Sequence, residues 1–163
     1  MSGFGDDMTS YVLATARWES NMGATMTELG PASYFNKYEQ GRLATTLGNT
    51  QPGDGAKYKG RGYVQITGKG NYRNWSNELG VDLVQHPELA ATPDVAAQVA
   101  VEGMDKGSFT GVSLYDFVNP AMEMPDFIRA RAVINGDVAK NGINIAKLAK
   151  GYAGKPASCR IQM

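Results

Sequence analysis

A glycine-rich stretch limits which secondary structure the middle of this chain can form. Residues 48–62 contain five glycines and Pro52, a composition that interrupts both helices and strands. The sequence on either side of this stretch has helical patterns. We therefore predict an irregular loop over residues 48–62, followed by a short strand at Tyr63–Thr67, within a fold made mainly of helices.

The first helical segment carries an apolar stripe that ends on a carboxyl group. Met8, Val12 and Ala16 recur at helical spacing, and Glu19 continues the same face. We predict a helix over residues 7–20. A carboxyl group at the edge of an apolar face loses hydration, which favours its protonated form. Glu19 is therefore a candidate general acid.

Periodicity and terminal residues predict five further helices. They are expected at residues 33–42, at 71–79, from Pro93 to Gly107, at 125–134, and in a last segment whose inner face carries Ile145, Leu148, Ala149 and Tyr152. The fold class is thus mainly α, or α+β with one small β element near residues 62–67. We expect a single domain over residues 1–163, with residues 155–163 as a flexible C-terminal tail.

The charges of the chain balance, because it has sixteen basic and sixteen acidic side chains. Without a net field, nucleic acid is not an expected partner, and we expect a monomer. After Asp137, however, every charged residue is basic: Lys140, Lys147, Lys150, Lys155 and Arg160. These residues form either a solvated helix face with a frayed terminus, or a tail that makes weak contact with an anionic cell envelope.

Cysteine and histidine are too few for a disulfide or a metal site. The single Cys159 has no internal partner, and with His86 alone it cannot complete a set of metal ligands. No cofactor is expected. The N-terminal residues lack the basic and apolar regions of a secretory signal, and no apolar run approaches the roughly 20 residues of a membrane span. We expect synthesis in the cytoplasm and release to an outside substrate by a separate route.

Three common motifs, two for nucleotide binding and one for serine catalysis, are missing. Gly53-Asp54-Gly55 and Gly60-Arg61-Gly62 match neither the P-loop nor the dinucleotide fingerprint, and no Gly-x-Ser-x-Gly accompanies His86. Two carboxyl groups, one protonated and one ionised, are instead what hydrolysis of a glycosidic bond requires. The sequence supplies Glu19 and Glu39 as candidates for this pair.

Several separate motifs, in one order, resemble glycoside hydrolase family 19, the chitinases and related phage and bacterial wall-lytic enzymes. The segment that is similar to the family's acid-bearing segment is Ala14–Ser20, and Tyr38–Gly41 resembles the segment with the second glutamate. The most specific piece is Tyr58–Thr67, followed by Asn71-Tyr72. Further agreement comes from Leu79–Leu83, Pro87–Leu89 and Ile134–Gly136.

This resemblance implies a lysozyme-like helical fold with a cleft between two lobes. It also implies inverting hydrolysis of β-1,4-linked polymers that contain N-acetylglucosamine. By residue, it implies Glu19 as general acid, Glu39 as general base and Thr67 as the hydroxyl that helps to hold the attacking water. Sugar contacts are implied for Tyr58, Gln65, Asn71 and Asn135. A water must fit between the carboxyl groups, so they should lie roughly 6.5–9.5 Å apart.

Two positions leave alternatives open. Glu28 also lies in a loop downstream of Glu19, and Glu39 is favoured as the base because its neighbours resemble the family segment more closely. Trp18 stands where many relatives have histidine. Its indole either adds to the desolvation of Glu19 or fills the core.

The favoured function is cleavage of peptidoglycan by an endolysin-type, bacteriolytic glycosidase. The short chain, the lack of disulfides and the lack of a signal peptide favour wall glycan over chitin. Chitin hydrolysis is the main alternative. A second class of function is a glycan-binding module that keeps the groove but has lost the chemistry. A third class, a purely structural or interaction protein, would be favoured by a closed surface with no cleft near Thr67.

Overall fold

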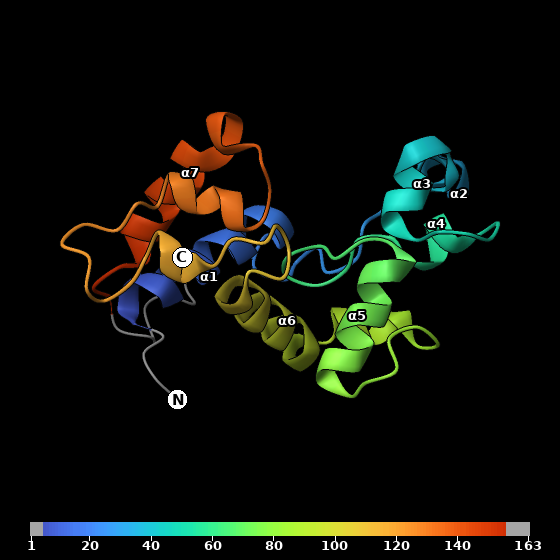
Figure 1. Cartoon of the computed structure of the whole chain (residues 1–163), viewed down its shortest axis with the longest axis horizontal. Helices are drawn as coiled ribbons and strands as arrows, with labels where there is room; N and C mark the ends of the chain where they lie inside the picture. The colour runs from blue at the N-terminus through green and yellow to red at the C-terminus, as the bar shows by residue number, and fades with distance from the viewer. Residues whose placement is uncertain (1–4, 156–163) are drawn as a thin grey trace. The chain divides into compact units, whose positions relative to one another are not determined.

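The structure is a computed structural model that describes residues 5–155 (Figure 1). It divides into two compact units: unit 1 holds the described residues up to Trp18 and from Ala100 onward, and unit 2 is Glu19–Val99. The elements are helical, so the predicted fold class is confirmed. The expected tail at 155–163, with Cys159 and Arg160, lies outside the described residues apart from Lys155. One domain and a cleft between lobes stay predictions.

In unit 1 the predicted apolar stripes are buried. Helix α1 (Asp6–Ser20) buries Met8, Val12 and Ala16. Its Tyr11 ring stacks on Phe127, with centroids 6.0 Å apart. Helix α6 (Pro93–Lys106) and helix α7 (Val138–Tyr152) are also where the sequence predicted helices. The inner face of α7 buries Ile145, Ala149 and Tyr152, and Leu148 is half-buried.

The helix predicted at residues 125–134 is wrong in extent. Only the 3₁₀ helix η4 (Arg129–Val133) forms there, after the shorter η3 (Leu114–Asp116). The Asp126 carboxylate accepts the Arg129 N–H at 3.0 Å, and the buried Arg131 guanidinium bonds the carboxylate of Asp137. This pair turns the chain after η4, and Asp137 stands immediately before α7.

Unit 2 is built from short helices. They are α2 (Ala32–Phe35), the 3₁₀ helix η1 (Asn36–Glu39), α3 (Gly41–Leu47), α4 (Asp54–Lys57), α5 (Lys69–Leu79) and the 3₁₀ helix η2 (Pro87–Ala91). The single helix predicted at 33–42 is therefore wrong, because Gln40 is extended and Gly41 has φ 53°. Helix α4 was missed inside the glycine-rich loop. The Asp54 carboxylate fixes it by accepting the N–H groups of Thr50 and Gln51, both at 3.0 Å.

The predicted strand Tyr63–Thr67 is instead a tight turn between two bridge positions. Arg61 pairs with Ile66 and, on its other side, with Thr27. Gln65, inside the turn, has a left-handed φ of 54°, which a regular strand excludes. The small β element is thus made of three short segments, residues 26–28, 60–62 and 66, held by Gly62 N–H to Met26 O and Glu28 N–H to Gly60 O, both 2.8 Å.

The pairing of Arg131 with Asp137 gives a prediction for stability. Hydrogen bonding from the Arg131 side chain lowers the pKa of Asp137. The stabilisation is therefore complete above the unfolded pKa of about 3.9 and is lost as pH falls through the lower folded value. Asp137→Asn removes the carboxylate charge that the buried guanidinium bonds, and we expect a loss of about 3 kcal/mol at pH 7.

Urea unfolding at pH 7 and at pH 3 tests this expectation, and the difference between the two proteins should shrink at the lower pH. The matched control is Glu102→Gln, which breaks an exposed pair with Lys106 in the same unit (2.9 Å). Exposed pairs contribute little, so the control should stay near wild type. Equal effects of both variants would contradict the special role of Asp137.

Candidate active site

Glu28 lies at the centre of a hydrogen-bond network in unit 2. Its carboxylate Oε2 accepts the Gly60 N–H at 3.0 Å, and its Oε1 accepts the Tyr38 hydroxyl at 2.9 Å. Lys37 Nζ lies 3.8 Å from the same Oε1, and the Glu28 side chain is 19% exposed. Both oxygens are therefore held by protein groups, while the carboxylate still reaches solvent.

Gly60 lets three oxygen-bearing side chains meet at one point. A Cβ on Gly60 would stand 2.9 Å from Gln65 Oε1, 3.3 Å from Glu28 Oε2 and 3.3 Å from Thr67 Oγ1. The Thr67 hydroxyl donates to the Gln65 carbonyl at 3.0 Å. Its oxygen lone pairs thus remain able to accept a hydrogen bond. The structure therefore brings Thr67 and Gln65, both predicted from the sequence, together with Glu28.

Glu39 has a different environment. Its Oε1 accepts the N–H groups of Gly53 at 3.0 Å and Gly55 at 2.8 Å, at the start of α4. A Cβ on Gly55 would stand 2.9 Å from that same oxygen. The carboxylate of Glu39 therefore stabilises the glycine-rich loop. Of the two alternatives for the base, the geometry favours Glu28, although the sequence had favoured Glu39.

Glu19 lies in the last turn of α1 and is half-buried. The chain turns sharply after it, because the Ser20 carbonyl accepts the N–H groups of Gly23 (3.1 Å) and Thr25 (2.9 Å). This turn leads into the bridged segment that ends at Glu28. The neighbouring Trp18 is 41% exposed, so the reading of its indole as a core filler is wrong.

The other predicted sugar-binding residues have varied surroundings. Tyr58 is only 1% exposed, and its hydroxyl donates to the Val84 carbonyl, so its placement is that of a core residue. Asn71 is exposed and donates to the Thr67 carbonyl at 2.7 Å, next to the site. Asn135 is exposed in unit 1. Sugar contacts for these residues stay predictions, and Tyr58 has the least support.

Sequence reasoning missed the roles of Lys37 and Tyr38. Tyr38 belongs to a motif that the sequence singled out, but its hydroxyl partner Glu28 stands ten residues earlier. Only tertiary folding brings the two together, so no local spacing could have signalled the contact.

A buried pair supports the backbone beneath the site. Arg61 Nη1 donates to the Lys57 carbonyl (2.8 Å) and to the Tyr72 hydroxyl (2.9 Å), and that hydroxyl donates to the Lys59 carbonyl (2.7 Å). Burial raises the pKa of Tyr72 to about 12, although Arg61 acts in the opposite direction. The phenol therefore keeps its proton near neutral pH and fixes the segment that ends at Gly60.

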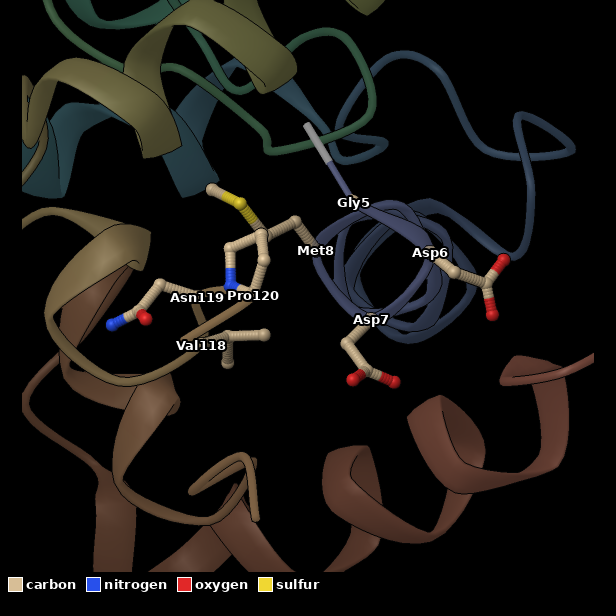
Figure 2. A pocket seen from close by; sticks show the side chains of 7 residues that line it. All are labelled: Gly5, Asp6, Asp7, Met8, Val118, Asn119 and Pro120. Atoms are coloured by element: carbon tan, nitrogen blue, oxygen red, sulfur yellow. The ribbon is translucent and has the colours of Figure 1, made fainter. Parts of the chain in front are cut away.

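A surface pocket in unit 1 involves none of the predicted site residues (Figure 2). It is lined by Gly5, Asp6, Asp7, Met8, Val118, Asn119 and Pro120. In Figure 2 the Asp6 carboxylate points away from the Met8 and Pro120 side chains. Among residues 5–155, no cluster of His, Cys, Asp or Glu is placed to bind a metal, and no helix is long and apolar enough to cross a membrane.

The close approach at Gly60 gives a prediction for activity. In Gly60→Ala the new methyl would collide with Gln65 Oε1, 2.9 Å away, and press on Glu28 Oε2 and Thr67 Oγ1. Overpacking of this kind costs about 1–3 kcal/mol. We expect hydrolysis to fall by more than tenfold, since a displacement of about 1 Å can cost about 100-fold. The matched control is Gly151→Ala, where a Cβ meets nothing within 4 Å.

Glycan-release assays and thermal melts of both variants provide the test. The control should keep wild-type activity and a similar melting temperature. Full activity in Gly60→Ala would show that the three side chains need not keep their present spacing.

Sequence comparisons find relatives over part of the chain. No family model matches it. A glycosyl hydrolase family 19 domain-containing protein of Haemophilus influenzae is 38% identical over 74 residues, which are 45% of this chain and 36% of that protein. Chitinase 8 of Oryza sativa subsp. japonica is 48% identical over 40 residues, 24% of this chain and 15% of that protein. The matches thus span about a third of the first relative and less of the second.

Solved structures share the fold over nearly the whole chain. Chitinase C from Streptomyces griseus superposes with a TM-score of 0.62 at 17% identity, covering 92% of this chain and 60% of that one. A chitinase C mutant gives a TM-score of 0.62 at 18% identity, covering 93% of this chain and 74% of that one. The sequence relatives thus bear out the resemblance to glycoside hydrolase family 19 that the motifs indicated, and the solved chitinase structures share the fold.

Proposed function

We propose that this chain is a glycosidase that cleaves β-1,4 bonds of N-acetylglucosamine-containing cell-wall glycan by an inverting mechanism. Glu19 is the general acid and Glu28 the general base, and Thr67 holds the attacking water. The observation that carries this assignment is that Glu28 Oε2 and Thr67 Oγ1 both lie 3.3 Å from the position of a Cβ on Gly60. The relatives named as a family 19 protein and as a chitinase support the reaction class.

The hydrogen bonds around Glu28 suit a base. Each carboxylate oxygen accepts one protein hydrogen bond and keeps a further acceptor site. A water between Glu28 and Thr67 gives one hydrogen bond to each and turns an oxygen lone pair toward the sugar. As it attacks the anomeric carbon, the carboxylate of Glu28 takes its proton. Glu19 gives its own proton to the leaving glycosidic oxygen, so the proton count balances and the configuration inverts.

The choice of base gives a direct prediction. Glu28→Gln removes the proton acceptor, and we expect the turnover number to fall by about 10²–10⁴. Glu19→Gln should lose a similar factor, because an amide cannot donate the proton. Glu39→Gln is the matched control, since an amide oxygen still accepts the N–H bonds of Gly53 and Gly55. We expect it to stay within about threefold of wild type.

Release of reducing ends from purified wall and from chitin oligomers measures these losses. Nuclear magnetic resonance of the fresh reducing end reports its configuration. A larger loss in Glu39→Gln than in Glu28→Gln would return the role of base to Glu39.

Positive charge beside the site supports wall glycan as the substrate. Lys37 Nζ lies 3.4 Å from the centroid of the Tyr34 ring, and Lys59 Nζ lies 5.0 Å from that of Phe35. Lys59 also precedes Gly60. Chitin is a neutral polymer, whereas the peptides of peptidoglycan carry carboxylates that ammonium groups attract. Chitin hydrolysis is the second candidate, favoured by the similarity to chitinases.

Lys59→Ala separates the two substrates. We expect activity on wall fragments to fall by about three- to tenfold at low salt, and less at high salt, because screening weakens the attraction. Activity on neutral chitin oligomers should not change. Lys140→Ala, an exposed lysine of α7 in the other unit, is the control and should match wild type on both. Equal losses on wall and chitin would count against a carboxylate-bearing substrate.

A further inference from the structure

Two groups of η1 converge on the same oxygen of Glu28. The Tyr38 hydroxyl donates to Oε1 at 2.9 Å, and Lys37 Nζ lies 3.8 Å from that oxygen. Gly60 N–H holds the other oxygen. The side of the carboxylate that faces η1 is therefore occupied by a proton donor and a positive charge. Oε2 is the oxygen beside Gly60, where Thr67 Oγ1 also lies.

The two groups are themselves fixed in place. Lys37 Nζ stands over the rings of Tyr34 and Tyr38, 3.4 Å and 4.6 Å from their centroids. The Tyr38 carbonyl accepts the side-chain amide of Asn49 at 3.0 Å. Asn49, which is buried, in turn accepts the Lys69 N–H at the start of α5. Such anchoring is more than an exposed ion pair needs, and it holds the donors in one geometry.

Both donors are in their hydrogen-bonding form near neutral pH. Burial, followed by the hydrogen bond to Glu28, raises the pKa of Tyr38. The hydrogen bond with Tyr34 raises the pKa of Lys37. From α5, Tyr72 also faces Glu28, and it keeps its proton with Arg61 bound to it. Near neutral pH Tyr38 therefore presents a proton, and Lys37 a positive charge, to Glu28 Oε1.

We propose that Tyr38 and Lys37 are positioning residues for Glu28, which hold Oε1 and direct Oε2 toward the water at Thr67. This inference rests on the proposed function, since it assigns Glu28 the role of base. Neither residue touches the sugar bond in this scheme. Their effect is to extend activity to lower pH and to raise the turnover number, with little effect on substrate binding.

The test compares pH–rate profiles of single substitutions. In Tyr38→Phe the donor to Oε1 is lost, and we expect kcat to fall by about tenfold with KM nearly unchanged. The acidic limb of kcat/KM should move up by about 0.5–1 pH unit, because the ionised form is less favoured. Lys37→Met should move the limb in the same direction, and Lys37→Arg should restore it. Tyr115→Phe, an exposed phenol of η3 in unit 1, is the control.

A second readout does not depend on catalysis. The ¹³C resonance of the Glu28 carboxyl group, followed by nuclear magnetic resonance, should titrate at higher pH in Tyr38→Phe than in wild type. If melting temperature and kcat fall while the acidic limb and this titration stay in place, Tyr38 has only a structural role and the proposal is overturned. If the titration moves but Glu28→Gln remains active, the positioning of Glu28 holds and the proposed function fails.

Discussion

The hydrogen bonds that join residues 26–28 to residues 60–62 are the contact on which the candidate site depends. The backbone N–H of Glu28 donates to the Gly60 carbonyl, and one carboxylate oxygen of Glu28 accepts the Gly60 N–H. Backbone pairing and side-chain orientation are therefore set together, and neither can change alone. Because Arg61 also pairs with Ile66, the same bridge fixes the turn that carries Gln65 and ends at Thr67. Glu28 and Thr67, the proposed base and water-binding hydroxyl, come from distant parts of the sequence and thus lie at one small β element.

Buried polar groups fix the backbone around this β element. Arg61 is 9% exposed, and its guanidinium donates hydrogen bonds to the Lys57 carbonyl and to the Tyr72 hydroxyl. Asp54 is likewise buried, and although burial acts against it, hydrogen bonds from Gln51 and Thr50 and the charge of Lys69 lower its pKa. Satisfied networks of this kind are rigid, because losing one partner leaves another group buried without a hydrogen bond. Such rigidity suits a site whose groups must keep fixed distances.

The sequence predicted the parts of the fold that local patterns decide. Helices α1, α6 and α7 have continuous apolar stripes and clear terminal residues, so their positions followed from periodicity. The segments at 33–42 and 125–134 failed because tertiary contacts override helical propensity there. At the second of these, the buried pair of Arg131 and Asp137 determines where the chain turns. At the first, Gly41 adopts a positive φ that no apolar pattern could reveal.

The two candidate catalytic groups differ in the same way: local sequence pattern places Glu19, whereas tertiary contacts place Glu28. Glu19 stands on a regular helix, so its place on an apolar face could be inferred from spacing alone. Glu28 stands outside any regular element, and its environment is made by Gly60 and Tyr38, which lie 32 and 10 residues away in the sequence. Similarity of the flanking residues favoured Glu39 as the base. In the structure, however, its carboxylate accepts the N–H groups of Gly53 and Gly55 in the glycine-rich loop. A carboxylate whose acceptor sites face backbone N–H groups in a loop stabilises the loop, whereas one that also faces a hydroxyl with spare lone pairs can share a water with it.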